Sequence, residues 1–308
     1  MPASAVAACP VCGTPRHPGV LGGQCPRCVL HGTVNGAFGN APPPDAAGWV
    51  PEDFGDFIIE ECVGRGPRGV VYRGLQPSIL RPVALKFFDA PPERAEHLIA
   101  AADCLGSADH PALAPVFCAG AHRGRPYLVM PFAAGGNLRR QLAGEPPSAI
   151  LVARLVAVLA RAVAAAHRAG LTHSRLTPEN VVFDEAGYPT VTDFVAAGLP
   201  EPGGAAARPA DAEFLAPEAA TASAAGPAAD VFSLGAILRL CLQPVRSTDD
   251  APEFGSGLRA VAGHCLEPDP AARPPTAAAL AETLELWLDH SGTSALEPVA
   301  EDATPVWG

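Results

Sequence analysis

The most apolar stretch of the chain, Ala149–Leu171, places the strongest constraint on its fold. Arg154, Arg161 and Arg168 recur in it at intervals of seven residues, so a helix would carry all three on nearly one face. A membrane-spanning helix would not tolerate this stripe of charge. The pattern therefore predicts an amphipathic helix that packs against the core of a globular domain and holds its arginines in water. The alternative is a functional basic patch.

Length and composition fit one domain of about 250 residues plus a small module. The chain has 308 residues, of which 48% are apolar. Its formal net charge of −11 argues against a general nucleic-acid binder, which would usually carry a basic face. No charged and apolar leader opens the sequence, so we expect a cytoplasmic protein. Five scattered cysteines without framework spacing are then expected to be reduced core thiols: Cys62, Cys104, Cys118, Cys241 and Cys265.

Four further cysteines are concentrated near the start of the chain, in Cys9-Pro-Val-Cys12 and Cys25-Pro-Arg-Cys28. Two such pairs at this separation can fold back so that four thiolates surround one zinc ion tetrahedrally. The alternatives are two disulfides, or a redox pair, which normally needs a strand–helix unit that so short a segment cannot supply. We predict a structural zinc site in a module that folds only with the metal, and His17 and His31 are spare ligands.

Composition divides the chain into four parts. Residues 1–31 form the zinc-ribbon module, and residues 32–53, rich in Gly, Pro and Ala, form a linker. The main domain extends over residues 54–290. The acidic segment 291–308 contains proline and lacks periodicity, so it is predicted to be disordered.

The main domain alternates short β-rich runs with turns in its first half and is helical in its second half. Two strand candidates, Phe57–Val63 and Val70–Gly74, flank the turn Gly64-Arg-Gly66-Pro-Arg-Gly69. Alone this turn is weak support for a function, because Gly-rich hairpins are common. The chain then presents, in order, Val83-Ala84-Leu85-Lys86, His173-Ser-Arg-Leu-Thr-Pro-Glu-Asn180, Asp193-Phe-Val195, Ala216-Pro-Glu218, Asp230-Val-Phe-Ser-Leu-Gly235 and Arg273.

This ordered set resembles the motifs of the eukaryotic-like Ser/Thr protein kinases of bacteria, over about three quarters of the chain. Some members of that family also carry an N-terminal zinc ribbon of this kind. The resemblance implies an α+β fold of two lobes with a nucleotide bound between them. The antiparallel β N-lobe would lie near residues 54–130 and the mainly helical C-lobe near residues 134–290.

The resemblance also assigns residues to the phosphates of ATP. Gly64, Gly66 and Gly69 would cover the phosphates with backbone N–H groups, since absent side chains let the backbone approach an anion. Lys86 would hold the α- and β-phosphates. The alternatives are a hairpin that merely keeps its turn and a lysine that extends to the surface from the end of a strand.

Magnesium and adenine are assigned in the same way. Asn180 and Asp193 would hold Mg²⁺, and the alternative is that both are structural hydrogen-bonding residues. The hinge, where adenine normally bonds to the main chain, would be Met130–Ala133. The apolar residues around adenine would be Val71, Ala84 and Val182, and the alternative for them is an ordinary core role, which is compatible with the first.

Several positions depart from the family pattern. Arg175 stands where the family has its general base, and loss of a positioned base typically costs about 10²–10⁴ in rate. Thr177 replaces the lysine that helps to neutralise the transferred phosphoryl group. Ala101 occupies the position of the helix glutamate that pairs with Lys86, although Glu96 or Asp103 are substitutes if the helix shifts. A β-branched residue, Val195, replaces the glycine after Asp193-Phe194, so this segment is expected to be fixed.

Two regions of the second half also depart from the pattern. The expected activation loop, Ala196–Leu215, has no Ser, Thr or Tyr and cannot be switched on by phosphorylation within the loop. Only Gln243–Gly257 separates the expected helices Asp230–Leu242 and Leu258–Leu266, so a substrate-docking helix of the family is predicted to be missing.

The resemblance predicts three structural contacts that survive these losses. Glu218 and Arg273 should form an ion pair, and Asp230 should bond the backbone of the turn 173–175. His173 should pack in an apolar spine rather than act as a base, together with Phe194, Leu105 and Val116. A new contact is also predicted: Asp211 pairs with Arg175 and closes the old catalytic centre, the alternative being two unrelated exposed charges.

We expect a catalytically impaired kinase-fold protein, a scaffold or nucleotide-responsive regulator whose partner is a protein such as another kinase or a signalling protein. Nucleic acid and a membrane span are not expected. A second hypothesis is an ATP-dependent Ser/Thr kinase with weak or atypical phosphoryl transfer. In a third, the zinc ribbon is the functional part and the kinase-like body supports it.

Overall fold

The computed structural model describes residues 7–8, 15–16, 54–66, 68–144, 146–194, 211–220, 226–243 and 252–291. The chain divides into two compact units, Met1–Pro92 with Phe117–Phe132, and Glu93–Val116 with Ala133–Gly308. Near the start of the chain, β1 (Ala7–Ala8) and β2 (Pro15–Arg16) pair antiparallel. Cys9, Cys12, Cys25 and Cys28, the predicted zinc ligands, lie outside the described residues.

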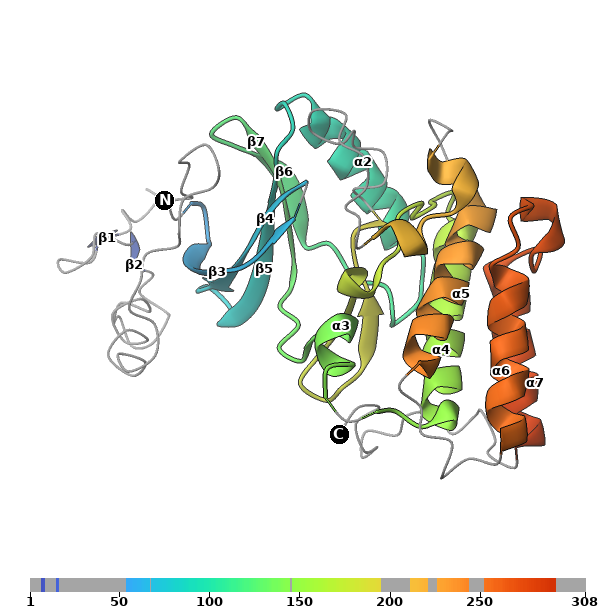
Figure 1. The fold of residues 1–308 in the computed structure, drawn as a ribbon. Helices are drawn as coiled ribbons and strands as arrows, with labels where there is room; N and C mark the ends of the chain where they lie inside the picture. Colours follow the sequence, from blue (N-terminus) through green and yellow to red (C-terminus); the bar gives the residue numbers. More distant parts are fainter. Residues whose placement is uncertain are drawn as a thin grey trace. The chain divides into compact units, whose positions relative to one another are not determined.

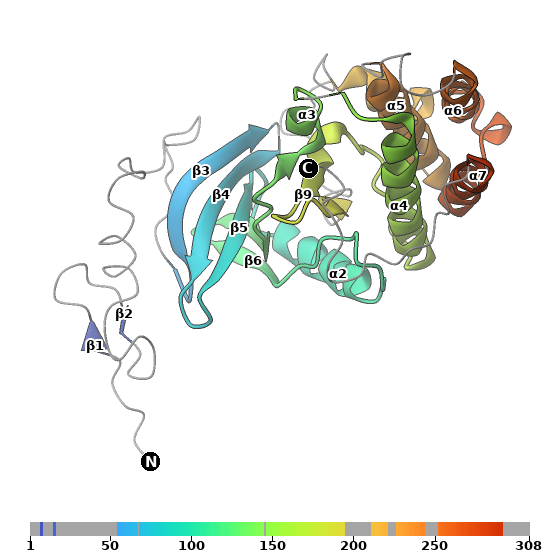
Figure 2. The ribbon, with the colours of Figure 1, turned by 90° about the horizontal axis from the view of Figure 1, so that it is seen from below.

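A five-stranded antiparallel sheet forms the first unit, in the order β3-β4-β5-β7-β6 (Figure 1; Figure 2). Its strands are β3 (Ile58–Gly66), β4 (Gly69–Gln76), β5 (Arg81–Phe88), β6 (Cys118–His122) and β7 (Arg125–Pro131). The two strands predicted on either side of the Gly-rich turn are thus confirmed as β3 and β4. Each is longer than expected, because the pairing continues to Gly66 and Gly69 at the turn.

One face of this sheet carries the core of the first unit. Successive side chains of a strand point to opposite faces, and the residues that alternate onto this face are rich in aromatic and β-branched types. They include Tyr72, Leu85, Phe87 and Val129, all fully buried. Phe54 closes the cluster, because its ring stacks on His122 with centroids 4.1 Å apart.

Helices dominate the second unit, and α4, α5, α6 and α7 run side by side in it (Figure 1). They are α4 (Ala149–Arg168), α5 (Pro227–Leu242), α6 (Pro252–Cys265) and α7 (Ala277–His290). Before α4 come α2 (Arg94–Gly106) and the short α3 (Leu138–Gln141). Residues 243–251 separate α5 from α6, which begins six residues earlier than predicted but still leaves only a short connection.

The predicted amphipathic helix is α4, which begins where the Oγ of Ser148 accepts a hydrogen bond from the backbone N–H of Leu151 (3.2 Å). Among the described helices α4 alone is long and apolar enough to cross a membrane, yet most of it is buried inside the fold. Arg154 and Arg168 are exposed, as predicted. Arg161 is not: it is half-buried and its Nε donates to Glu285 of α7 (2.9 Å), because α7 packs along this side of α4.

A three-stranded antiparallel sheet completes the second unit, in the order β10-β9-β8. Its strands are β8 (Gly136–Asn137), β9 (Val181–Phe183) and β10 (Pro189–Val191). The loop between α4 and β9 and the residues that follow β10 therefore come together at this small sheet, which places residues 173–180 near residues 192–194.

The scattered cysteines do not all lie in the core. Cys241 and Cys265 are fully buried, and burial raises the pKa of each thiol to about 12. A Cβ on Gly235 would lie 2.3 Å from the Cβ of Cys265, so the glycine allows the close packing of α5 on α6. Cys62 and Cys118 are only half-buried, and Cys104 is exposed on α2, which corrects the prediction for that residue.

Candidate functional site

The Gly-rich hairpin joins β3 to β4, and its three glycines differ in what the fold requires of them. Gly69 has φ of 145°, and a Cβ there would lie 1.9 Å from the backbone oxygen of Phe87, so only glycine fits. A Cβ on Gly64 or Gly66 would meet nothing within 4 Å. Packing therefore explains one glycine, and the space beside the other two is open.

Four of the residues predicted to contact ATP share one face of the first sheet. Val71 is directly opposite Lys86, and Ala84 is directly opposite Met130. Cross-strand neighbours point to the same face, as do alternate residues of one strand. This face is opposite to the one that carries the aromatic core. The Nζ of Lys86 lies 5.3 Å from the ring centroid of Phe88.

The other predicted adenine contacts belong to the second unit. Val182 is in the middle of β9, where it pairs with Asn137 and Thr190. Ala133 precedes β8 and accepts a hydrogen bond from the backbone N–H of Gly136 (3.3 Å). Both side chains are half-buried.

Asp230 anchors the loop that follows α4. Its carboxylate is fully buried and accepts hydrogen bonds from the backbone N–H groups of His173 (2.8 Å) and Ser174 (2.6 Å). The Nε2 of His167 lies 2.8 Å from the same carboxylate. Ser174 has φ of 62°, a left-handed conformation that costs free energy in a residue other than glycine. The predicted role of Asp230 is confirmed, because these bonds hold the strained turn.

His173 packs against Phe194, as predicted. Its ring meets Phe194 edge to face with centroids 4.9 Å apart, and its Nε2 lies 2.9 Å from the backbone oxygen of Thr192. Leu105, predicted for the same spine, is buried on α2, and Val116 is half-buried.

Asn180 and Asp193, the predicted magnesium ligands, lie side by side. The Nδ2 of Asn180 donates to the Oδ2 of Asp193 (3.0 Å). The Oδ1 of Asn180 accepts from both the backbone N–H (3.0 Å) and the hydroxyl (2.9 Å) of Thr177. Asp193 also has a left-handed backbone, with φ of 71°. The structure thus joins three predicted site residues in one hydrogen-bonded chain, Thr177–Asn180–Asp193.

Arg175 lies between the anchored Ser174 and the fully buried Leu176, and its own side chain is half-buried. Asp211, its predicted partner, directly precedes the short 3-10 helix Ala212–Phe214. Arg139 lies close to both segments. Its Nε is 2.5 Å from Glu179 in the loop, and its guanidinium carbon is 5.6 Å from the ring of Phe214. The Arg175–Asp211 contact stays a prediction.

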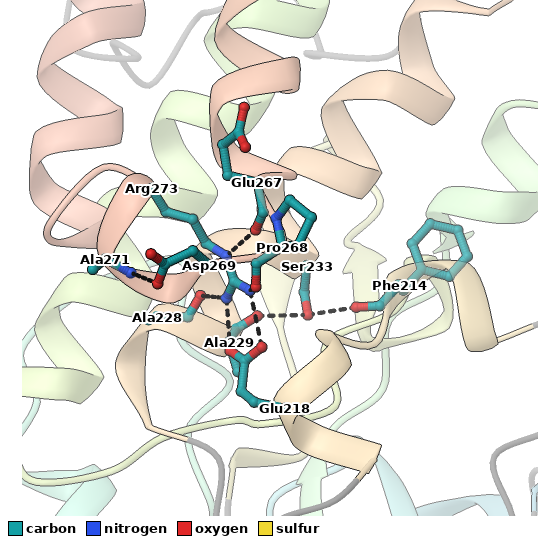
Figure 3. Close-up of polar contacts among 10 residues, drawn as sticks. All are labelled: Phe214, Glu218, Ala228, Ala229, Ser233, Glu267, Pro268, Asp269, Ala271 and Arg273. Atoms are coloured by element: carbon teal, nitrogen blue, oxygen red, sulfur yellow. Dashed lines mark hydrogen bonds and ion pairs between the residues drawn. The ribbon is translucent and has the colours of Figure 1, made fainter.

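The ion pair of Glu218 with Arg273 is confirmed and is bidentate (Figure 3). Arg273 Nη1 donates to Glu218 Oε1 (2.6 Å) and Nη2 donates to Oε2 (2.9 Å). These hydrogen bonds hold the pKa of the Glu218 carboxyl below its ordinary value. Further bonds run from Arg273 to the backbone oxygens of Ala228, Glu267 and Pro268.

Some predicted features lie elsewhere or outside the described residues. On α2, Ala101 is half-buried, while Glu96 and Asp103 are exposed. Val195 and residues 196–210 of the expected activation loop are not described, nor are residues 292–308. Within the described part of the chain, no three His, Cys, Asp or Glu side chains cluster closely enough to hold a metal ion.

Comparison with known proteins decides the family. Residues 57–251 match the family model of the protein kinase domain. The chain belongs to the protein kinase family. Its fold resembles that of a crystal structure of the Mycobacterium tuberculosis PknI kinase domain, a cysteine-to-alanine mutant, with a TM-score of 0.58 and 22% identity over 76% of this chain and 96% of that one. The predicted kinase fold, with an antiparallel sheet and a helical part, is therefore confirmed.

Curated kinases of mycobacteria are similar in sequence. The serine/threonine-protein kinase PknK of Mycobacterium tuberculosis is 36% identical over 192 residues, which are 59% of this chain and 17% of PknK. Serine/threonine-protein kinase PknL of Mycobacterium bovis is 32% identical over 228 residues, which are 69% of this chain and 54% of PknL. The chain thus spans about half of PknL and a sixth of PknK. The protein kinase family uses ATP with Mg²⁺.

Sequence reasoning missed two contacts of this kinase domain. It did not connect Thr177 with Asn180, although a threonine before a proline is a common helix start and Thr177-Pro178 had that signal. It also did not connect Arg139 with Glu179, which are 40 residues apart, and no local pattern gives that distance.

Proposed function

We propose that this chain is a catalytically impaired member of the protein kinase family, a pseudokinase, that binds nucleotide and regulates a protein partner. The observation that carries the proposal is Arg175 in a loop whose backbone is otherwise held in place. Asp230 fixes the two residues before it, and Leu176 after it is fully buried. Arginine stays protonated in proteins and cannot accept a proton from a substrate hydroxyl. The scaffold of the loop is thus kept while its base is lost.

Nucleotide binding is supported by Lys86, which is the only lysine of the chain among twenty arginines. An ammonium is a compact point charge and a guanidinium is a planar fork, so the two are not interchangeable at a phosphate. Twenty positions of the chain carry an arginine, whereas its single lysine is on β5. The open space beside Gly64 and Gly66 supports the same interpretation, since packing gives no reason for either glycine.

The partner and the N-terminal module are part of the proposal. The net charge of −11 disfavours nucleic acid, so we assign the chain a protein partner, such as another kinase or a signalling protein. Residues 1–31 act as a structural zinc ribbon, on the strength of two C-x2-C pairs.

A working Ser/Thr kinase with weak phosphoryl transfer is the second candidate. The similar mycobacterial proteins are named serine/threonine-protein kinases, and Asn180 lies 3.0 Å from Asp193. Phosphoryl transfer depends mostly on positioning and electrostatics, so transfer without the base is chemically conceivable.

The test is a titration of the purified full chain with ATP, with and without Mg²⁺. We expect saturable binding that is lost in Lys86→Met and kept in Arg154→Met, which removes one exposed charge from α4. An ATP-derived acyl phosphate that modifies lysine gives a second readout, because Lys86 is the only lysine that it can label. No binding at millimolar ATP would contradict the nucleotide part and leave a scaffold.

Turnover separates the two candidates. We expect no transfer of the γ-phosphate to the chain itself or to a general protein substrate. Transfer that disappears in both Lys86→Met and Asp193→Asn would overturn the impairment and establish the weak kinase.

A further inference from the structure

The carboxamide oxygen of Asn180 is fully engaged inside the protein. It accepts two hydrogen bonds from Thr177, at 3.0 Å from the backbone N–H and 2.9 Å from the hydroxyl. A carboxamide oxygen has two lone pairs, so both are used. Thr177 is only 8% exposed, and little water competes for these bonds.

These bonds also have a structural purpose. Thr177 and Asn180 are the first and last residues of the turn that opens the 3-10 helix Pro178–Asn180, and their contact caps that helix. The other end of the carboxamide donates to Asp193, whose left-handed backbone needs support from its surroundings. Asn180 therefore acts as a clamp between the helix start and Asp193.

Asn180, bonded in this way, is not suited to be a ligand of Mg²⁺. A magnesium ligand must present a lone pair at about 2.0–2.1 Å in a near-ideal octahedron. Asn180 would have to release at least one of its two bonds to Thr177, and this would weaken the helix cap. Asp193 differs, because a carboxylate has two oxygens with about four lone-pair sites in all, whereas the carboxamide of Asn180 has one oxygen with two.

We propose that Thr177 locks Asn180 out of metal coordination, so that a bound nucleotide is accompanied by at most one divalent ion, held through Asp193. Thr177 is then the residue that decides the number of metal ions. The metal count rests on the proposed nucleotide binding, whereas the lock itself is present in the nucleotide-free protein.

The metal count is measured by titrating Mn²⁺ into the full chain with saturating non-hydrolysable ATP analogue and following free Mn²⁺ by electron paramagnetic resonance. We expect one Mn²⁺ per chain. Thr177→Val removes the hydroxyl bond and should strengthen a second Mn²⁺ site about fivefold, the equivalent of one hydrogen bond. Thr192→Val is the matched control, because that hydroxyl donates to the backbone oxygen of Asn180 (3.2 Å) and not to its side chain. Two ions in the unmodified chain would overturn the proposal, as would an equal response to both variants.

The lock is also tested without nucleotide, by thermal unfolding of Thr177→Val, Asn180→Ala and the double variant in metal-free buffer. Each single substitution should lower Tm by a few degrees. Once Asn180→Ala is present, Thr177→Val should lower Tm clearly less than it does alone, because its hydroxyl has already lost the carboxamide acceptor. Additive losses would overturn the lock. Absence of nucleotide binding would instead contradict the proposed function, and the unfolding result would still decide the lock.

Discussion

Arg273 donates two hydrogen bonds to the Glu218 carboxylate, and its remaining guanidinium N–H groups donate to nearby backbone oxygens (Figure 3). The three other N–H groups donate to the oxygens of Glu267 (2.8 Å), Ala228 (2.9 Å) and Pro268 (3.1 Å). All five guanidinium N–H groups are therefore satisfied although the residue is 3% exposed. One side chain thus ties the segment after the activation loop to the start of α5 and to the turn before α7.

Loss of the hydrogen bonds of Arg273 should strongly reduce the stability of the fold. Arg273→Ala removes both guanidinium donors from the Glu218 carboxylate and one donor from each of three backbone oxygens, so we expect the free energy of unfolding to fall by about 3–5 kcal/mol. Arg273→Lys should recover only part of this, since an ammonium cannot reproduce the bidentate fork. Urea denaturation measures both. Arg239→Ala is the matched control, because Arg239 is half exposed and lies 3.8 Å from Glu213, and it should lose less than about 1 kcal/mol.

The same pair should give stability a pH dependence. The folded pKa of Glu218 is below its unfolded value, because Arg273 donates hydrogen bonds to the charged carboxylate. Its contribution is therefore complete above the unfolded pKa, about 4.3, and is lost as pH falls through the lower folded pKa. The difference in unfolding free energy between the unmodified chain and Glu218→Gln should be constant from about pH 6 to pH 8, a range that begins about two units above the unfolded pKa. The difference should shrink below about pH 4. A difference that grew with acidity would contradict this.

Arg175 and Asp211 should be energetically coupled. Arg139 lies against both of their segments, and both side chains are half-buried. A double-mutant cycle with Arg175→Ala and Asp211→Ala should give a coupling of about 1–3 kcal/mol in unfolding free energy. The exposed pair Arg239–Glu213 belongs to the same region and should give less than about 0.5 kcal/mol.

Exchange of the two charges offers a second check of that pair. The double variant Arg175→Asp with Asp211→Arg should be more stable than either single variant, because the two positions again carry opposite charges that attract each other. A coupling near zero and no rescue would mean two independent charges.

The N-terminal module should contain one zinc ion per chain. Metal analysis of the purified full chain should show this ion, and Cys9→Ser or Cys25→Ser should remove it, because a structural site needs four thiolates. Chelation should make residues 1–31 sensitive to protease, since so small a module has no core of its own. Cys104→Ser is the matched control: this thiol is exposed on α2, and its loss should leave the zinc content unchanged. Full zinc content in both Cys9→Ser and Cys25→Ser would contradict the site.

Local pattern was sufficient for much of the fold. The strands on either side of the Gly-rich turn follow from β-rich runs bounded by glycines. The buried helix α4 follows from the apolar stretch that begins at Ala149 and from the seven-residue spacing of its arginines. The contacts of Asp230 and of Glu218 with Arg273 were found because the order of motifs resembles a family.

Tertiary structure decided what depends on distance in space. Arg161 looked like a solvated charge until α7 placed Glu285 beside it, 124 residues later in the chain. Gly64, Gly66 and Gly69 look alike in sequence, but only Gly69 has the backbone of Phe87 against it. Asn180 is the residue type expected of a metal ligand in sequence, but in the fold its carboxamide oxygen accepts a hydrogen bond from the hydroxyl of Thr177. Sequence spacing sets which residues a helix or strand presents, whereas the partner of each polar atom is set by elements that meet only when the chain has folded.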